Sequence, residues 1–274
     1  MKDRSSKTIN PLWSEFVKLV KKEVVPALGC TEPISLALAA AIAAEKLGKP
    51  VERVEAKVSA NLMKNGMGVT VPGTGMTGLL IAAAVGAIGG DPDGKLEVLK
   101  NLTEEQIAKG KQMIAEKRVR LAIAEVPNIL YSEATVVHKQ EWVTVCIADT
   151  HTQVIRIEKN GKVIFMLEPS TQESDDKEPE FLMHGVTARD VFDFAIEAPL
   201  EMIRFIREAA ILNNALSQEG MSGRYGLHIG ATMDRHMNKG LLPDGLLTQV
   251  LMRTTAASDA RMGGAALPAM TNSG

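Results

Sequence analysis

The stretch VPGTGMTG, residues 71 to 78, places Gly73, Gly75 and Gly78 between a strand-like run and an apolar run. Glycines allow backbone N–H groups to approach a ligand closely, and the N-terminus of a following helix carries a partial positive charge. A carboxylate or a phosphate would be stabilised at such a turn. A strand-to-helix turn that needs glycine only for its backbone angles has the same pattern, so both interpretations stay open.

Nucleotide-binding loops share part of this spacing. A dinucleotide fold needs an acidic residue about twenty positions later, at the end of a second strand. Asp91, Asp93 and Glu97 follow the glycines, but no β-branched strand carries them, and Pro72 would interrupt the ladder of a central parallel strand. A P-loop is excluded because no Lys-Ser or Lys-Thr pair follows. The dinucleotide interpretation is therefore disfavoured.

A second polar segment, ANLMKNGMG at residues 60 to 68, precedes the glycines and is predicted to be a flexible loop. It contains Asn61, Lys64, Asn65 and Gly66. A lysine beside two amides can bind a carboxylate or transfer a proton. The alternative for Lys64 is an ordinary solvated surface lysine.

Cys30 lies in ALGCTEPI, at the predicted start of a helix that Thr31 would cap. The helix dipole would lower the pKa of a thiol there and favour the thiolate, the form that attacks an electrophile or binds a metal. The alternative is a small buried side chain. Cys146 lies in mid-strand in WVTVCIAD and is predicted to pack in a core.

The sequence alone assembles no complete metal site, because it has no C-x-x-C, paired-histidine or H-E-x-x-H motif. The histidines are predicted to be scattered polar surface or loop residues; they are His138, His151, His184, His228 and His236. The last two flank a glycine-rich stretch that is predicted to line a cleft.

Helices and strands must position these groups. Helices are predicted after Asn10 and over residues 31–47, 79–88, 103–117, 187–214 and 246–262. Residues 119 to 167 are rich in Val, Ile and Thr, and Asn160-Gly161 between two alternating runs predicts a hairpin. The predicted fold class is α+β, helix-rich with an antiparallel β-sheet in the middle third.

Three parts are predicted along the chain. Residues 1–118 form a helical part with Cys30 and the glycine-loop motifs, residues 119–170 an antiparallel β region, and residues 171–274 a second helical part. The acidic stretch STQESDDKEPE, at the start of the third part, is predicted to be a loop or linker.

Composition limits the class of protein. With 31 basic and 33 acidic residues the formal net charge is -2, and no basic block with interleaved aromatics is present, so nucleic acid is not expected as a partner. The N-terminus lacks an apolar h-region and the apolar runs are too short to span a bilayer, so no membrane association is expected. Two cysteines fit a reducing compartment. A cytoplasmic protein is predicted.

Three motifs carry a resemblance: GCTEPI at residues 29 to 34, KNGMGVTVPGTGMTG at 64 to 78 and MTNSG at 270 to 274. With them the chain resembles the L-cysteine desulfidase family, relatives of the iron–sulfur L-serine dehydratase alpha chain. The resemblance implies a lyase with a [4Fe–4S] cluster held by three cysteines. Such an enzyme eliminates hydrogen sulfide from L-cysteine, and the aminoacrylate product decays to pyruvate and ammonia. A small amino-acid substrate is the expected partner.

The resemblance also implies roles for individual residues. Cys30 resembles the first cluster ligand. The residues that resemble the substrate-side loops are Asn61, Lys64, Asn65, Gly66, Gly73, Thr74 and Gly75. Within this set we infer that Lys64 is catalytic and that the other six bind substrate.

The chain departs from the family at its C-terminus. In the family, TNSG continues into a region that holds the other two cluster cysteines, and Cys146 matches neither of them. We therefore expect a chain shortened at its C-terminus, with an incomplete ligand set and no activity alone. Apolar surface left exposed would favour self-association, and a homo-oligomer is expected.

Other functions remain open beside L-cysteine desulfidation. L-serine dehydratase activity is the nearest alternative. A noncatalytic protein that binds a carboxylate at the glycine turn is a second, and a nicotinamide oxidoreductase is a third. A Schiff-base role for Lys64 is a residual alternative.

Overall fold

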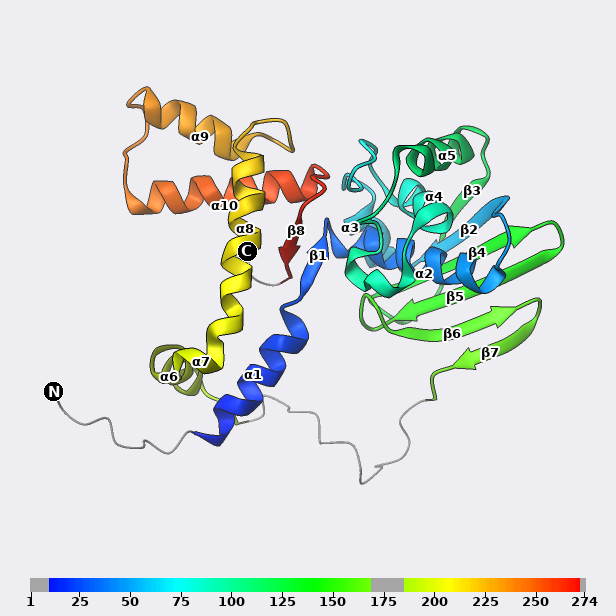
Figure 1. The fold of residues 1–274 in the computed structure, drawn as a ribbon, viewed down its shortest axis with the longest axis horizontal. Helices are drawn as coiled ribbons and strands as arrows, with labels where there is room; N and C mark the ends of the chain where they lie inside the picture. Colours follow the sequence, from blue (N-terminus) through cyan, green and yellow to red (C-terminus); the bar gives the residue numbers. More distant parts are fainter. Residues whose placement is uncertain (1–9, 169–184, 272–274) are drawn as a thin grey trace.

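The computed structural model describes residues 10–168 and 185–271. Figure 1 shows two parts, a β-sheet with helices on one face and a group of helices beside it. The predicted α+β class is confirmed. The linker predicted over STQESDDKEPE, His184 and the terminal NSG lie outside the described residues.

The main sheet has six strands in the order β3-β2-β4-β5-β6-β7. Their bounds are β2 Arg53–Val58, β3 Val119–Ile123, β4 Tyr131–His138, β5 Glu141–Ala148, β6 Val154–Lys159 and β7 Lys162–Met166. From β4 to β7 the strands form the predicted antiparallel succession. The antiparallel prediction is wrong for β3, which pairs in parallel with β2, because the helices between these two strands carry the chain back to the same end of the sheet.

The β6–β7 hairpin turns at Asn160 and Gly161, as predicted. Both residues have positive φ, 50° and 83°, the backbone that a tight hairpin turn requires. Asn160 Oδ1 also accepts a hydrogen bond of 2.7 Å from the backbone N–H of Trp142 on β5. The turn is thus tied to the neighbouring strand.

Helices α2 (Thr31–Leu47), α4 (Leu79–Gly89) and α5 (Glu104–Ala115) belong to the sheet-bearing part. Alanines and glycines let α2 and α4 approach closely: a Cβ added at Gly86 would lie 2.4 Å from the carbonyl oxygen of Ala37. A buried hydrogen bond of 2.8 Å between the hydroxyls of Ser35 and Ser132 joins α2 to β4. Together these elements enclose the main core.

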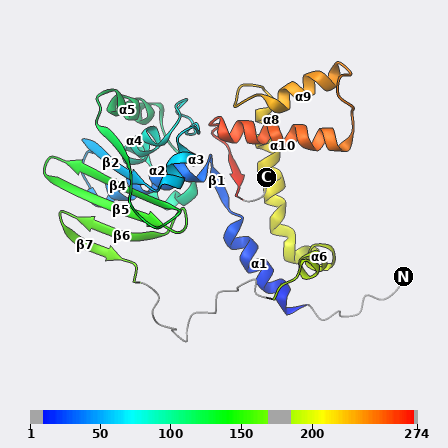
Figure 2. The ribbon, with the colours of Figure 1, turned by 180° about the vertical axis from the view of Figure 1, so that it is seen from behind.

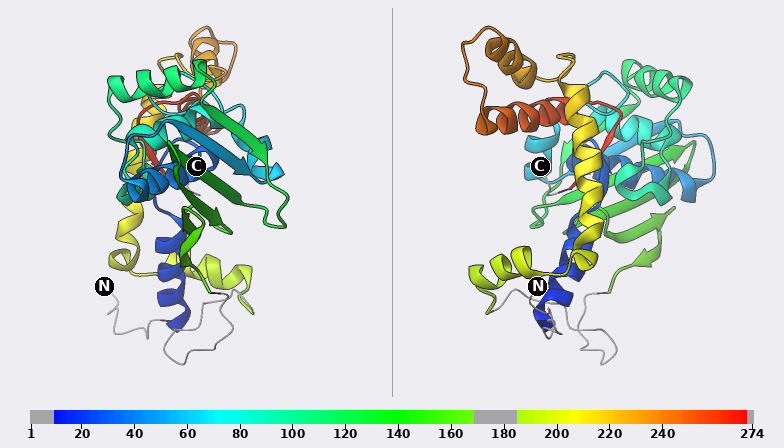
Figure 3. Two further views of the ribbon diagram at one scale, coloured as in Figure 1. Left: turned by 90° about the vertical axis from the view of Figure 1, so that its right-hand side faces the viewer. Right: turned by 60° about the vertical axis from the view of Figure 1, so that its left-hand side comes forward.

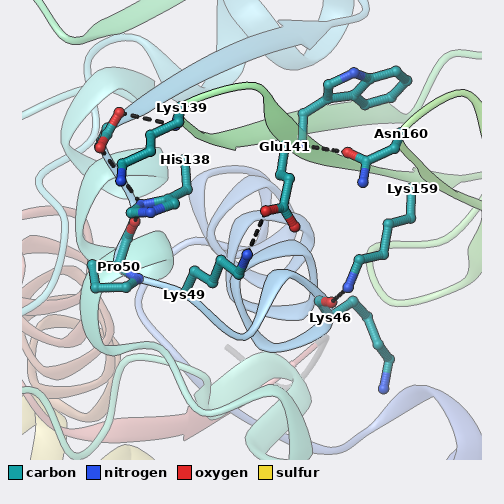
Figure 4. A network of polar contacts seen from close by, with 10 residues as sticks. Lys46, Lys49, Pro50, His138, Lys139, Glu141, Lys159 and Asn160 are labelled. Carbon is teal, nitrogen blue, oxygen red and sulfur yellow. Dashed lines mark hydrogen bonds and ion pairs between the residues drawn. The ribbon is translucent and has the colours of Figure 1, made fainter.

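Polar contacts fasten the C-terminal end of α2 to the sheet (Figure 4). Lys49 forms an ion pair with Glu141 at the start of β5. His138 Nδ1 lies 2.8 Å from the carbonyl oxygen of Pro50, and Lys159 Nζ donates to the carbonyl oxygen of Lys46. The loop after α2 is therefore held against the ends of three strands.

The second part is built from helices α1 (Pro11–Glu23), α6 (Ala188–Glu197), α7 (Leu200–Ile203), α8 (Arg207–Gly220), α9 (Ile229–Asn238) and α10 (Leu246–Met262). In Figure 3, α8 runs from the end near α6 to the end near α9 and α10. Trp13 and Phe16 of α1 pack on Phe194 of α6. Asn10 and Thr187 cap α1 and α6 as predicted.

A short second sheet connects the two ends of the chain. Strand β1 (Pro26–Leu28) pairs antiparallel with β8 (Pro268–Met270). Figure 2 shows β1 from behind, between the sheet-bearing part and the helices. The divisions predicted after residues 118 and 170 stay a prediction, although β2 from the first part lies within the sheet of the second.

Two local predictions are wrong. Residues 60 to 68 were expected as a loop, but Ala60–Gly66 form helix α3, because the Ser59 side chain caps it by accepting a hydrogen bond from the N–H of Leu62. The run VTV was expected as a strand. It makes only an isolated bridge, Thr70 with Thr77, because the glycine turn folds the chain back on itself at once.

Of the helices in residues 10–168 and 185–271, none combines the length and the apolar character that crossing a membrane requires.

Substitution of Gly86 tests the close packing of α2 on α4. Gly86→Ala should lower the free energy of unfolding by about 1–3 kcal/mol, because the added methyl group meets backbone atoms of Ala37 that cannot move aside. Gly94→Ala is the control, since no atom lies within 4 Å of the added carbon. Thermal unfolding should show a loss of several degrees for the first variant only. Equal melting temperatures would show that the two helices are loosely packed.

Candidate functional site

The segments with predicted chemistry meet between the two parts of the molecule. The start of α2 carries Cys30 and Glu32, α3 carries Asn65, and the glycine turn follows α3. The end of α10 contacts this region, with Arg261 Nε donating to the carbonyl oxygen of Gly29 at 3.1 Å. Arg261 also lines a groove of about 500 Å³ between α8, α10 and β8.

Cys30 is the N-cap residue of α2, so the prediction that Thr31 caps this helix is wrong; Thr31 is its first residue. Cys30 has extended backbone and makes no side-chain cap hydrogen bond. Before it, Gly29 has φ 74°, and a Cβ there would lie 2.6 Å from the ring of Pro72. The chain at GCTEPI therefore packs directly on the chain at VPGTGMTG.

The Cys30 thiol donates a hydrogen bond to Glu32 Oε2 at 3.0 Å. Asn65 Nδ2 donates to the other carboxylate oxygen at 3.4 Å. Burial, followed by the hydrogen bond and the negative charge of Glu32, raises the pKa of the Cys30 thiol to about 12, although the positive charge of Arg261 opposes this. The expectation of a lowered thiol pKa is wrong, because desolvation and a nearby carboxylate outweigh the helix dipole.

Glu32 and His151 interact electrostatically in this cluster. Burial favours the neutral form of Glu32, but hydrogen bonds from Cys30, the backbone and Asn65 together with the charge of His151 hold its pKa below the ordinary value. His151 comes from the loop between β5 and β6. Burial lowers the pKa of His151 and Glu32 opposes that shift, while His151 Nε2 is buried with no hydrogen-bond partner among the described residues.

The glycine turn has the strained backbone that its sequence predicts: Gly73, Gly75 and Gly78 have φ of 72°, 65° and 94°. Its N–H groups are partly occupied, because Gly73 N–H donates to the carbonyl oxygen of Gly264 at 3.3 Å. Thr74 is buried, and its hydroxyl donates to the carbonyl oxygen of Val71 at 2.8 Å. These hydrogen-bonding groups of the turn are therefore already occupied, either within the turn or by the chain just after α10.

Helix α3 positions the remaining predicted residues. Asn65 is linked to Cys30 through Glu32, and Gly66 is buried where a Cβ would lie 2.6 Å from Leu79. Lys64 is exposed and Asn61 is half-buried, and within the described residues neither makes a hydrogen bond to this cluster. The structure thus gathers Cys30 and Asn65 and leaves Lys64 and Asn61 beside them on the same helix.

Three residues of the cluster were not predicted as functional: Glu32, His151 and Arg261. Glu32 had a local signal, since it follows Cys30 by two positions at the start of a helix. His151 and Arg261 had none, because only the tertiary fold brings them to Cys30. His228 and His236, predicted to line a cleft, are both exposed, and His228 precedes α9 while His236 belongs to it.

The described residues do not supply a complete metal centre. They contain no group of three or more His, Cys, Asp or Glu side chains placed to hold a metal ion. Cys146, the second of two cysteines, is buried in β5, as predicted, and accepts a hydrogen bond from the Tyr131 hydroxyl at 3.4 Å. A [4Fe–4S] cluster needs several thiolates, so these 274 residues do not fit one by themselves.

Comparison with known proteins identifies relatives. The serine dehydratase alpha chain family matches residues 93–274. A UPF0597 protein from Chromobacterium violaceum is 66% identical over 265 residues, which are 96% of this chain and 60% of the relative. UPF0597 protein YhaM from Escherichia coli is 53% identical over 97% of this chain and 62% of the relative. The chain thus spans about 60% of the length of such relatives, and no solved structure matches.

Replacing the Glu32 carboxylate tests the electrostatics of the cluster. Glu32→Gln should lower the pKa of Cys30, because it removes a negative charge and weakens the hydrogen bond that holds the thiol proton. Alkylation of Cys30 at pH 9, followed by mass spectrometry of its peptide, should become about tenfold faster for each unit of lowered pKa. In the unsubstituted protein the rate should still be rising at pH 10.

The matched control is Glu45→Gln, which removes an exposed carboxylate from the same helix. Its Cys30 alkylation rate should equal that of the unsubstituted protein. An unchanged rate in Glu32→Gln would mean that burial alone governs the thiol.

Proposed function

Because this chain belongs to the serine dehydratase alpha chain family, we propose that it carries one side of the active site of a lyase that acts on a small amino acid. The proposed reaction is elimination. A base takes the Cα proton, and the Cβ substituent leaves with its bonding electrons as hydrosulfide or hydroxide. The resulting aminoacrylate tautomerises to an imine, which water hydrolyses to pyruvate and ammonia. The finer proposal is that L-cysteine is the substrate, with L-serine as the alternative.

The observation that supports this proposal is the meeting of Cys30, Glu32 and Asn65 beside the glycine turn. Such an arrangement places a thiol, a carboxylate and an amide donor in one half-buried region, with Arg261 contributing positive charge. Elimination from an amino acid needs groups of these types, to hold the substrate carboxylate and to manage protons.

The substrate-side roles remain proposals. Asn61, Asn65 and Gly66 on α3, and Gly73, Thr74 and Gly75 in the turn, are proposed to surround the substrate carboxylate. Lys64 is proposed as the proton-transfer group, because it lies on α3 directly before Asn65 and carries an amine, a group type used in acid–base catalysis. Both the hydroxyl and the backbone N–H of Thr74 donate to the carbonyl oxygen of Val71, so a substrate contact by Thr74 would have to replace one of these hydrogen bonds.

The proposed enzyme contains an iron–sulfur cluster, for which this chain would supply only part of the ligand set. Cys30 is proposed as one ligand, and further thiolates would have to come from outside the 274 residues, which contain two cysteines. Cytoplasmic location likewise stays a proposal from composition.

A chimera tests the function directly. Residues 1–274 of this chain would replace the matching segment of the Chromobacterium violaceum relative, which supplies the length that this chain does not span. After anaerobic iron–sulfur reconstitution we expect visible absorbance, with sulfide and pyruvate released from L-cysteine. Cys30→Ala should abolish both absorbance and products, whereas Cys146→Ala should retain them, because Cys146 is buried in β5 and its hydrogen bonds go to Tyr131 and Glu133.

The outcomes separate the alternatives. Pyruvate from L-serine without sulfide from L-cysteine would replace the desulfidase by a dehydratase. Saturable binding of either amino acid without product would support the noncatalytic carboxylate-binding protein. A cluster and turnover that survive Cys30→Ala would remove Cys30 from the ligand set.

Lys64→Ala in the same chimera tests the proton-transfer role. We expect kcat to fall by about a hundredfold or more, with a smaller change in KM, because general acid–base groups act in the transition state. Lys111→Ala, an exposed lysine on α5, is the matched control and should leave kcat unchanged. A loss confined to KM would instead assign Lys64 to substrate binding.

A further inference from the structure

Strand β7 is one edge of the six-stranded sheet. It pairs with β6 on one side, and Leu167 extends this pairing by donating its N–H to the carbonyl oxygen of Ile155 at 2.8 Å. On the other side, no strand from the described residues pairs with it. The free edge therefore offers N–H and C=O groups to another strand.

This edge is apolar and exposed along its length. The five residues from 163 to 167 are each at least 40% exposed: Val163 40%, Ile164 49%, Phe165 42%, Met166 56% and Leu167 42%. Proteins protect a free edge with a central charge, a proline or a bulge. Between Lys162 and Glu168, β7 has no charge and no proline, and its one irregularity is a register shift that leaves Ile164 without a partner on β6. The opposite edge, β3, carries Arg120 in its interior. The β7 edge thus has the features of a docking strand.

The segment KVIFMLE, residues 162 to 168, is complementary to a second copy of itself. In an antiparallel pair centred on Phe165, Lys162 of each copy faces Glu168 of the other. Between these two ion pairs, only apolar residues face one another. Opposite charges and apolar pairs across strands both stabilise a sheet.

We propose that β7 is a homodimer interface, in which two copies pair their β7 strands antiparallel about Phe165 and join their sheets into one. A second copy fits better than an unrelated strand, because a twofold axis at Phe165 satisfies both charged ends at once. The homo-oligomer expected from the sequence would thus assemble through β7. The proposal does not depend on the enzymatic function, because no residue of the Cys30 cluster belongs to β7.

Sedimentation of the chain at micromolar concentration should give twice the mass of 29.5 kDa for one copy. Phe165→Lys should give the mass of a single copy, because it places two positive charges face to face in the interface. Ile123→Lys is the matched control, since Ile123 is exposed on the opposite edge strand, and it should remain dimeric. Circular dichroism of both variants checks that each is folded. A single-copy mass for the unsubstituted chain would overturn the proposal.

A charge exchange tests the register. Lys162→Glu should raise the dimer Kd by about tenfold, because both ion pairs become like-charge contacts. Glu168→Lys should do the same. The double variant should return Kd to the original value, since it restores both pairs in reversed order. Failure of the double variant to recover would contradict this pairing.

Cross-linking provides a second readout that does not depend on affinity. In the proposed pair, residue 165 faces itself, at a Cα separation that a disulfide can bridge. Phe165→Cys should therefore form a disulfide-linked dimer on mild oxidation, and Ile123→Cys should not. A dimer that sediments normally but fails to cross-link through residue 165 would place the interface elsewhere.

Discussion

The pairing of β1 with β8 is the constraint on which the site depends. It joins residues 26–28 to residues 268–270, and Thr271 extends it through hydrogen bonds to the backbone of Glu23 and Val25. Because β8 follows α10 closely, this pairing fixes the end of α10 beside the turns at Gly29 and Gly73. Together with the hydrogen bonds from Thr70 to Met262 and from Gly73 to Gly264, the pairing holds Arg261 beside the turn that precedes Cys30.

The electrostatics of the site follow from the pairing of β1 with β8. Cys30 and Glu32 lie at a helix N-terminus, where the dipole favours negative charge, yet the two groups share one proton between them. Since both are partly buried and close together, only one is charged, and the carboxylate takes the charge while the thiol keeps its proton. His151 acts electrostatically on the Glu32 carboxylate, whereas Arg261 acts on the Cys30 thiol and donates to the carbonyl oxygen of Gly29.

The elements predicted correctly are those with local signals. The capping box at Thr103 and the Asn160-Gly161 turn are encoded within a few residues, so α5 and the β6–β7 hairpin could be predicted from the sequence. Helix α3 was missed, because glycine and asparagine in ANLMKNGMG suggested a loop while the Ser59 cap was overlooked. The parallel β2–β3 pair and the approach of Arg261 and His151 to Cys30 depend on contacts between distant segments. Local patterns cannot encode such contacts.

The glycines of the turn differ in what they do: some pack the two parts of the molecule together, and one leaves its N–H group unused within the described residues. Gly264 lies so close to Thr70 that a Cβ would meet its side chain at 2.6 Å, and Gly73 N–H is bonded to Gly264, so these glycines join the two parts of the molecule. Gly75 differs, because no atom lies within 4 Å of its Cβ position, and within the described residues its N–H makes no hydrogen bond. Any anion-binding capacity of the turn therefore rests on Gly75 more than on Gly73. The proposed ligand-binding role of VPGTGMTG therefore involves fewer backbone groups than its glycine spacing suggests.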